Sequence, residues 1–318
     1  MTGQPRFTVV VTDQVFPSVE TERQMLAGIG AGLVIADGTS EGVAAVAAGA
    51  DALLNTYLPV TGELLASAPR CRIVARYGIG TDNVDIAAAR ERGVVVTNVP
   101  DYSVEEVAVH TLSLLLALIR RIPDATRLVA AGGWGLDGLR PIRRLSGLRA
   151  GLVGYGRIGR TLASYLTALG CEVVVHDPFL TPGPGLPPLV TLAELLAGCD
   201  AVSLHAPLTP ATRGLIGTAE LAAMKPDAVL VNTARGGLVD VDALIAALQA
   251  GQLRGAALDV LDAEPPAAGR LPADLPNLLV TPHMAYYSEE SIAESQRKAA
   301  TQVIKVLTGG QPDYPVAG

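Results

Sequence analysis

The chain has 318 residues, of which 49% are hydrophobic, so it is long enough to bury two separate cores. A formal net charge of −7 argues against direct binding to nucleic acid or to an anionic membrane. The longest apolar stretch, residues 107–119, is interrupted by polar side chains and is too short to span a bilayer.

The N-terminal stretch MTGQPRFTVVVTD lacks the charged start and the long apolar core of a secretory signal. The three cysteines lie far apart, each in or beside an apolar run, which is typical of reduced core thiols. The four histidines show no metal-ligand spacing. We therefore expect a cytoplasmic protein without a metal site.

Short apolar segments alternate with helical segments along roughly the first 100 residues. Strands are expected at 7–11, 33–36, 51–55, 72–76 and 94–97, and helices at 19–26, 42–48 and 62–68. This alternation predicts an α/β fold with a parallel sheet, in a smaller domain that lacks a phosphate-binding fingerprint.

The strand at 72–76 runs directly into the turn Gly78-Ile79-Gly80. Glycines at this position expose backbone N–H groups where ligands of parallel sheets bind. The same stretch is equally consistent with a plain turn forced by two glycines. The sequence leaves both interpretations open.

A long apolar helix is expected after Ser103, ending at Ile119. Ser103 and Glu106 have the S-x-x-E spacing of a capping box, and Pro123 is expected to stop the helix. The helix is apolar on nearly all sides, which predicts burial all round, between domains or between subunits. Residues 131–149 are interpreted as a long surface connection.

The chain is organised around the glycine cluster Gly154, Gly156 and Gly159, which follows an apolar strand at 150–153 and opens a helix at 157–169. In this context the G-x-G-x-x-G spacing predicts dinucleotide binding. The first glycine allows a tight turn, the second lets the backbone approach a pyrophosphate, and the third lets the helix lie close to the sheet. The helix N-terminus offers N–H groups to the phosphates.

Asp177, at the end of a strand expected at 171–176, indicates which dinucleotide is bound. A carboxylate there accepts hydrogen bonds from a ribose 2′-hydroxyl and repels a 2′-phosphate. Residues 178–181 contain no Arg or Lys that would hold a phosphate. We expect NAD(H) rather than NADP(H).

The rest of the chain completes a doubly wound sheet of about six or seven strands. Further strands are expected at 201–205, 228–232, 255–259 and 278–280, with helices near 192–197, 219–223, 241–250 and 288–307.

Three polar stretches follow the carboxyl ends of these strands, where ligands of such folds bind: NTARGG, DVLDAEPP and TPH. They make Arg235, Glu264 and His283 candidate catalytic residues. Each alone also has a structural explanation, as a turn, loop or strand-end residue.

Seven motifs, in this order, resemble the D-isomer-specific 2-hydroxyacid dehydrogenases, which include the phosphoglycerate dehydrogenases. They are YGIGTDNVD, TNVPDYSVEEVA, GYGRIG, LHAPLTPATRGLI, NTARGGLVD, ALDVLDAEPP and TPHMA. The resemblance implies a Rossmann NAD-binding domain at 100–284 and a discontinuous, flavodoxin-like substrate domain at 1–99 plus 285–318. It also implies NAD(H)-dependent interconversion of a small 2-keto acid and a D-2-hydroxy acid, usually in a homodimer.

The resemblance assigns roles to matching residues. Arg235 would grip the substrate carboxylate and carbonyl, His283 would donate the proton in reduction, and Glu264 would partner His283. The N–H groups of Gly78, Ile79 and Gly80 would bind the substrate carboxylate, with Arg76 or Tyr77 lining the pocket. The residues expected to contact the cofactor are Gly154, Gly156, Arg157, Ile158, Gly159, Asp177, Thr212, Thr233, Ala234, Arg235 and Asp259.

The chemistry of hydride transfer requires such a set. As hydride reaches the keto carbon, negative charge develops on the oxygen, which a guanidinium polarises and an imidazolium protonates. The planar fork of an arginine also binds a carboxylate better than the point charge of a lysine.

Two departures from the family pattern concern the substrate and the function. An acid common in the family is replaced by Val109, and the segment after His283 reads MAYYSE instead of the glycine-rich version of phosphoglycerate enzymes. This segment looks more like the branch of the C-terminal-binding corepressors, with Tyr286 where those proteins carry Trp. An NAD(H)-sensing binding protein of the same fold is therefore the alternative to a dehydrogenase.

Overall fold

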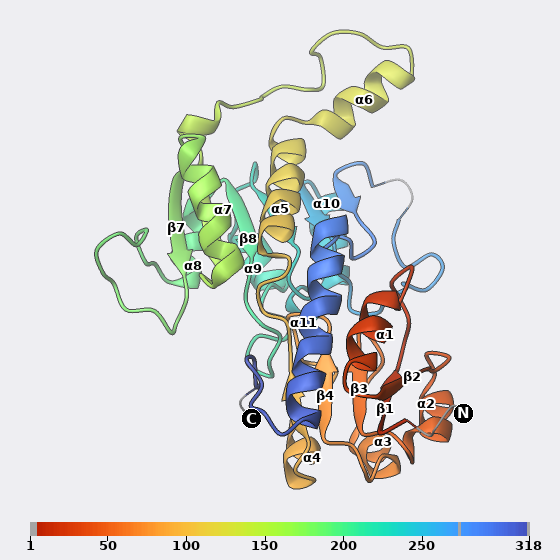
Figure 1. Ribbon diagram of the computed structural model, residues 1–318. Coiled ribbons are helices and arrows are strands. Elements are labelled where there is room, and N and C mark those ends of the chain that lie inside the picture. The colour runs from red at the N-terminus through yellow and green to blue at the C-terminus, as the bar shows by residue number, and fades with distance from the viewer. Residues whose placement is uncertain (1–4, 273–274, 317–318) are drawn as a thin grey trace. The chain divides into compact units, whose positions relative to one another are not determined.

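A computed structural model describes residues 5–272 and 275–316 (Figure 1). The chain divides into two compact units: unit 1 is Met1–Tyr102 with Ser288–Gly318, and unit 2 is Ser103–Tyr287. Each boundary lies three residues beyond the one expected from the sequence, at 99/100 and at 284/285. No helix among the described residues is both long enough and apolar enough to cross a membrane.

Unit 1 contains a five-stranded parallel sheet in the order β2-β1-β3-β4-β5, the flavodoxin-like order. Its strands are β1 (Phe7–Val11), β2 (Ala31–Ile35), β3 (Ala52–Asn55), β4 (Ile73–Arg76) and β5 (Val95–Thr97). Its helices are α1 (Glu20–Ala27), α2 (Ser40–Ala47), α3 (Gly62–Ser67), α4 (Ile86–Glu91) and α11 (Glu289–Leu307).

Helices cover both faces of this sheet, which is why β3 and β4 consist of buried residues throughout. The C-terminal helix α11 packs on β3, β4 and α1, so the end of the chain completes the unit that the beginning started. Helix α4 is not expected from the sequence; Asp85 caps it by accepting a hydrogen bond from the Ala88 N–H at 2.9 Å.

Unit 2 contains a six-stranded parallel sheet in the order β11-β10-β9-β8-β6-β7. Its strands are β6 (Arg149–Val153), β7 (Glu172–His176), β8 (Ala201–Leu204), β9 (Val229–Asn232), β10 (Gly255–Leu258) and β11 (Leu278–Val280). The order reverses between β6 and β8, which is the switch point where such folds bind ligands. The predicted fold class, a Rossmann unit plus a smaller flavodoxin-like unit, is confirmed.

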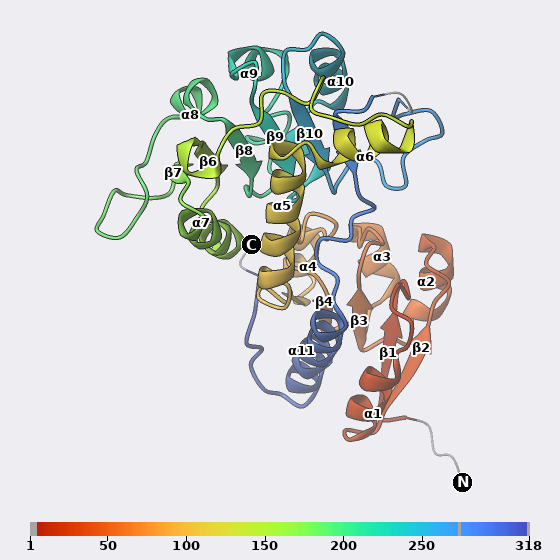
Figure 2. The same cartoon turned by 90° about the horizontal axis from the view of Figure 1, so that it is seen from above.

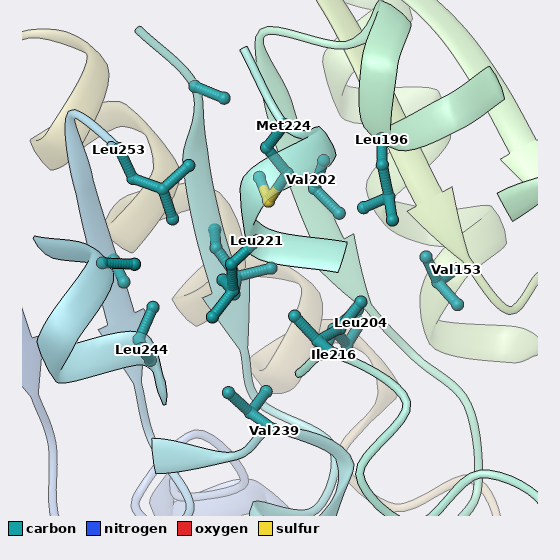
Figure 3. Close-up of a cluster of buried hydrophobic side chains, with 14 of the residues drawn as sticks. Val153, Leu196, Val202, Leu204, Ile216, Leu221, Met224, Val239, Leu244 and Leu253 are labelled. Carbon is teal, nitrogen blue, oxygen red and sulfur yellow. The ribbon is translucent and has the colours of Figure 1, made fainter. Parts of the chain in front are cut away.

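Helices also cover both faces of the second sheet (Figure 2). One face carries α5 (Val104–Ile119) and α7 (Arg157–Ala168), and the other carries α8 (Leu192–Gly198), α9 (Thr218–Ala223) and α10 (Val241–Gln249). Figure 3 shows the core on the second face, where Val202 and Leu204 of the sheet pack against helix side chains such as Leu221. Burying both faces leaves the loops at the strand ends to carry the polar residues.

Helix α5 departs from the prediction at its start. Ser103 is the N-cap, but among the described residues its hydroxyl makes no capping hydrogen bond, so the expected capping box is not formed. The reason is local, because Ser103 is buried and its ψ of 28° differs from the extended backbone of an ordinary N-cap.

The end and the surface of α5 also differ from the prediction. Arg121 is left-handed, with φ 56°, and a further helix, α6 (Ile122–Ala130), begins there with Pro123 in its first turn. Pro123 therefore starts a second helix as well as ending the first. One side of α5 stays outside the core, where Val109 is 45% exposed. The helix is therefore not buried on all sides within one chain. Residues 131–144 form a largely exposed connection, which is shorter than the expected 131–149 because a 3-10 helix (Leu145–Gly147) precedes β6.

Candidate active site

The three fingerprint glycines are needed for two different structural reasons. A Cβ on Gly154, whose φ is 95°, would lie 2.7 Å from the His205 carbonyl group, and a Cβ on Gly159 would lie 2.6 Å from the Gly154 oxygen. A Cβ on Gly156 would meet nothing within 4 Å among the described residues. The first and third glycines are thus required by close packing, whereas the second faces the open side of the turn.

That open side has the features expected of an anion-binding surface. Gly156 is the N-cap of α7 and has no side chain to satisfy the first-turn N–H groups, which include those of Arg157 and Ile158. These donors and the positive end of the helix dipole suit the pyrophosphate of a dinucleotide.

Asp177 lies at the end of β7, next to this turn. Its Oδ2 accepts the Tyr155 N–H at 2.9 Å, and its Oδ1 accepts the Phe179 N–H at 3.0 Å. The two bonds fix the carboxylate beside the glycine turn, and each oxygen keeps acceptor capacity for a ribose hydroxyl. The arrangement fits a dinucleotide that carries an unmodified ribose.

Thr233 follows β9 and is tied to helix α5. The Thr111 hydroxyl donates its one proton to the Val107 carbonyl oxygen at 2.6 Å, so the Thr233 hydroxyl is the donor in its 2.7 Å contact with Thr111. Thr212 instead organises the loop after β8, because its hydroxyl donates to the Pro207 oxygen at 2.6 Å. In this arrangement both hydroxyl protons are used in hydrogen bonds within the chain.

Glu264 and His283 are brought together from two different loops. Glu264 Oε2 lies 2.5 Å from His283 Nδ1, with side chains 31% and 29% exposed, and Glu264 Oε1 accepts the Leu261 N–H at 2.7 Å. Burial raises the pKa of Glu264, but the hydrogen bonds from His283 and Leu261 and the charges of His283 and Arg235 lower it. The net pKa lies below the ordinary value, so the carboxylate is ionised at neutral pH.

Arg235 is carried by the neighbouring loop, directly after β9. The Asn232 side chain holds this loop by accepting the Ala234 N–H at 3.0 Å and donating to the Arg235 oxygen at 2.8 Å. Gly236 then touches the loop that carries Glu264, since a Cβ on it would lie 1.9 Å from the Leu261 carbonyl carbon. The guanidinium and the carboxylate thus belong to loops in direct backbone contact.

Asp259 organises the loop around His283. It is 1% exposed and accepts the Thr281 hydroxyl at 2.5 Å and the N–H groups of Met284 and Ala285 at 3.0 and 2.9 Å. Its backbone oxygen accepts the His283 N–H at 2.8 Å. His283 has φ 51°, a strained conformation for a residue with a Cβ, which these bonds impose. Asp259 was expected to contact the cofactor, but much of its hydrogen-bond acceptor capacity is used within the chain.

Two histidines at this edge of the sheet were missed from the sequence. His205 follows β8 and lies against Gly154, and burial lowers the pKa of His205 to about 4, so the ring is neutral at neutral pH. His110, in α5, contacts Thr281 at 3.1 Å through Nε2. The polar pair His110-Thr111 inside an apolar helix was the available sequence signal for the contact of His110. Among the described residues no cluster of His, Cys, Asp or Glu is arranged to hold a metal ion.

In unit 1, the turn after β4 has its carbonyl groups directed inward. The Gly78 oxygen accepts the Val99 N–H at 3.1 Å, and the Ile79 oxygen accepts Asn98 Nδ2 at 2.6 Å. Among the described residues the N–H groups of Ile79 and Gly80 have no acceptor. The Arg76 side chain lies over this turn, since a Cβ on Gly78 would fall 2.1 Å from Nη1 of Arg76. Nε of Arg76 donates to Asn83 Oδ1 at 2.7 Å.

Tyr77 bears on the prediction that Arg76 or Tyr77 lines a substrate pocket. It is 2% exposed, and its hydroxyl donates to buried Glu22 at 2.7 Å. Burial, and then the charge of Glu22, raise the pKa of Tyr77 well above its usual range. Its side chain is a core element of unit 1, packed between α1 and α11, where Gln296 also donates to Glu22 at 3.0 Å.

The fold and the site together define a dinucleotide-binding protein of the doubly wound α/β class. A family model described as the NAD-binding domain of D-isomer-specific 2-hydroxyacid dehydrogenases matches residues 112–285, more than half of the chain. The chain therefore belongs to this family, and the expectation of an NAD-binding domain is confirmed.

Individual relatives agree. The chain is 42% identical over 258 residues to D-3-phosphoglycerate dehydrogenase of Mycobacterium tuberculosis, covering 80% of this chain and 48% of that protein. It is 39% identical over 251 residues to glycerate dehydrogenase of Methylorubrum extorquens, covering 77% and 78%. The D-lactate dehydrogenase structure from Aquifex aeolicus, complexed with NAD and lactic acid, superposes with a TM-score of 0.88 at 28% identity, covering 98% and 99%. The chain spans about half the length of the phosphoglycerate dehydrogenases it matches.

Proposed function

We propose that the protein interconverts a small 2-keto acid and the corresponding D-2-hydroxy acid with NAD(H). The observation that carries this proposal is the 2.5 Å contact between His283 and ionised Glu264, in loops at the carboxyl edge of an NAD-binding sheet. Relatives named as dehydrogenases of phosphoglycerate, glycerate and D-lactate support the substrate class.

Each catalytic residue has a separate task in this proposal. NADH, when bound, supplies the hydride. Arg235 binds the substrate carboxylate and polarises the keto oxygen, as a guanidinium fork does. Because Nδ1 of His283 is engaged with Glu264, Nε2 is the nitrogen that donates a proton to that oxygen. Glu264 orients the ring through its contact with Nδ1. In the oxidation direction His283 accepts the proton.

The cofactor is held by residues of unit 2. The first-turn N–H groups at Arg157 and Ile158 bind the pyrophosphate, and Asp177 binds the ribose hydroxyls. Thr212, Thr233, Ala234 and the remaining acceptor capacity of Asp259 complete the contacts.

Unit 1 offers a carboxylate-binding turn. The N–H groups of Ile79 and Gly80 and the guanidinium of Arg76 form a positively polarised group, and we propose it as the part of this unit that binds the substrate carboxylate. We do not propose this role for the Tyr77 side chain, because its hydroxyl already donates to Glu22.

A second copy of the chain is the proposed partner. Exposed apolar side chains lie on α5 (Val109, 45% exposed), at the start of α6 (Ile122, 55%) and in the connection after it (Trp134, 91%). An apolar surface of this kind is typical of an interface, and a two-fold axis pairs it with itself. A cytoplasmic location stays a prediction.

The alternative function is an NAD(H)-sensing binding protein. The observation that favours it is the MAYYSE segment, in which Met284 and Tyr287 are 44% and 47% exposed beside His283. Oxidation of NADH, tested with glyoxylate, pyruvate, hydroxypyruvate and larger 2-keto acids, separates the two. If the protein is a dehydrogenase, at least one of these keto acids is reduced. Tight binding of NADH without reduction of any of these keto acids supports the sensor.

A further inference from the structure

His110 lies in the second turn of α5 and reaches the ends of two strands. Its Nε2 is 3.1 Å from Thr281 Oγ1 and 3.6 Å from Asp259 Oδ1, and its side chain is 19% exposed. Thr281 follows β11 and Asp259 follows β10. The ring thus contacts the residues that hold the loop of His283, from a helix that carries none of the proposed catalytic groups.

The protons in this chain of contacts are determined by counting donors. Thr281 has one hydroxyl proton and donates it to Asp259 Oδ1 at 2.5 Å. The hydroxyl oxygen is therefore the acceptor toward His110, and Nε2 of His110 carries a proton. The direction of donation runs from His110 to Thr281 to Asp259.

The acceptor at the end of this chain holds the backbone around His283. Asp259 accepts the N–H groups of Met284 and Ala285 at 3.0 and 2.9 Å, and its backbone oxygen accepts the His283 N–H at 2.8 Å. His283 itself has φ 51°, which a residue with a Cβ adopts only under constraint. If the Thr281 hydroxyl is free to rotate, one constraint on this loop is lost.

We propose that His110 is a positioning residue for His283. By donating from Nε2 it orients the Thr281 hydroxyl toward Asp259, and this fixes the strained loop in which His283 meets Glu264. The gain is pre-organisation, since a small displacement of an acid/base group lowers the rate of proton transfer. The inference rests on the proposed catalytic role of His283.

A matched pair of substitutions tests the donor at Nε2. In His110→Gln the amide nitrogen takes the place of Nε2, whereas in His110→Asn the shorter side chain does not reach Thr281. We expect kcat with NADH and a keto acid to fall about tenfold in the Asn variant, with the KM for NADH within about twofold of wild type. We expect the Gln variant to stay within about threefold of wild type.

A double-mutant cycle tests the path. Thr281→Val removes the intermediate hydroxyl, and the His110→Asn, Thr281→Val double variant is expected to be no slower than Thr281→Val alone, because both changes break one chain. Ser164→Ala is the control, since its hydroxyl donates only to the Thr161 oxygen of its own helix. Melting temperatures of all variants show whether each one folds.

Three results overturn the inference: wild-type kcat in His110→Asn, a Gln variant as slow as the Asn variant, or losses in the two single variants that multiply. His283→Gln is measured in parallel. If that variant retains wild-type kcat, the proposed role of His283 is wrong and His110 has nothing to position. If His283→Gln is inactive while His110→Asn is not, only the inference about His110 fails.

Discussion

Gly236 lies so close to Leu261 that a Cβ on the glycine would fall 1.9 Å from the Leu261 carbonyl carbon. The contact joins the loop of Arg235 to the loop of Glu264, and no side chain fits between them. A glycine is needed there for space and not for backbone conformation, because its φ is not in the left-handed region.

Gly236→Ala therefore has a defined consequence. We predict that the methyl group displaces the Leu261–Glu264 segment and lowers kcat for keto-acid reduction by about tenfold to a hundredfold, since displacement of this order disturbs the positioned groups. Gly49→Ala is the control, because a Cβ there meets nothing within 4 Å in the described part of the chain. Equal kcat in both variants would show that the contact does not position Glu264.

The preference for NADH depends on Asp177. Asp177→Ala removes two acceptor oxygens and the charge that repels a 2′-phosphate. Hydrogen bonds to a charged group contribute about 1.5–3 kcal/mol, so we expect the KM for NADH to rise about tenfold or more. The ratio of kcat/KM with NADH to kcat/KM with NADPH should fall. The measurement is kcat/KM with both cofactors. A wild-type protein that uses both equally contradicts the assignment.

The division of work between Glu264 and His283 predicts a pH effect. Burial raises the pKa of Glu264, but the hydrogen bonds from His283 and Leu261 bring it below the ordinary value. The carboxylate that contacts His283 is therefore retained below the usual carboxyl range and is lost only as the pH falls through the lowered pKa. In Glu264→Gln no carboxylate titrates, so we expect a lower kcat/KM for reduction at neutral pH and no acid limb from this residue. Profiles of kcat/KM against pH for wild type and Glu264→Gln measure this; profiles that coincide mean that Glu264 does not act on His283.

Assembly as a dimer is predicted from the exposed apolar side chains of α5, α6 and the connection after it, Val109, Ile122 and Trp134. We expect light scattering at micromolar concentration to give twice the 32.7 kDa mass of one chain. Val109→Lys places a charge among these side chains and should shift the mass toward the monomer. Val46→Lys is the matched control, since Val46 is a 36% exposed valine on a helix of unit 1. A monomeric wild-type protein excludes the prediction.

The buried pair Glu22 and Tyr77 predicts a stability effect. In Glu22→Leu the Tyr77 hydroxyl and the Gln296 amide lose their acceptor, and each unpaired buried donor costs about 1–3 kcal/mol in the free energy of unfolding. Denaturant unfolding, followed by a probe in unit 1, measures the loss. Glu91→Gln on the exposed end of α4 serves as the control. A change in Glu22→Leu no larger than in the control refutes the role of the pair.

The sequence predicted the strands and the fingerprint because their patterns are local. An apolar strand, a glycine turn and an acid some twenty residues later lie within one stretch of chain. The sequence did not predict side-chain contacts that depend on residues far away in the chain. The direction of Tyr77 depends on Glu22, 55 residues earlier, and the contact of His110 on Thr281, 171 residues later. The missing capping box at Ser103 depends on one backbone angle, and the extra helix α6 on a left-handed Arg121.

The return of α11 to unit 1 has a consequence for how the chain folds during synthesis. Ser295 donates to the Tyr77 oxygen at 2.7 Å, and Arg72 donates to the Val306 oxygen at 2.7 Å, so the interior of unit 1 requires residues made more than 200 positions later. All strands of unit 2 have left the ribosome before α11 does. Unit 2 is therefore able to fold first. Until α11 is synthesised, unit 1 keeps the apolar face of its sheet that α11 covers exposed to solvent.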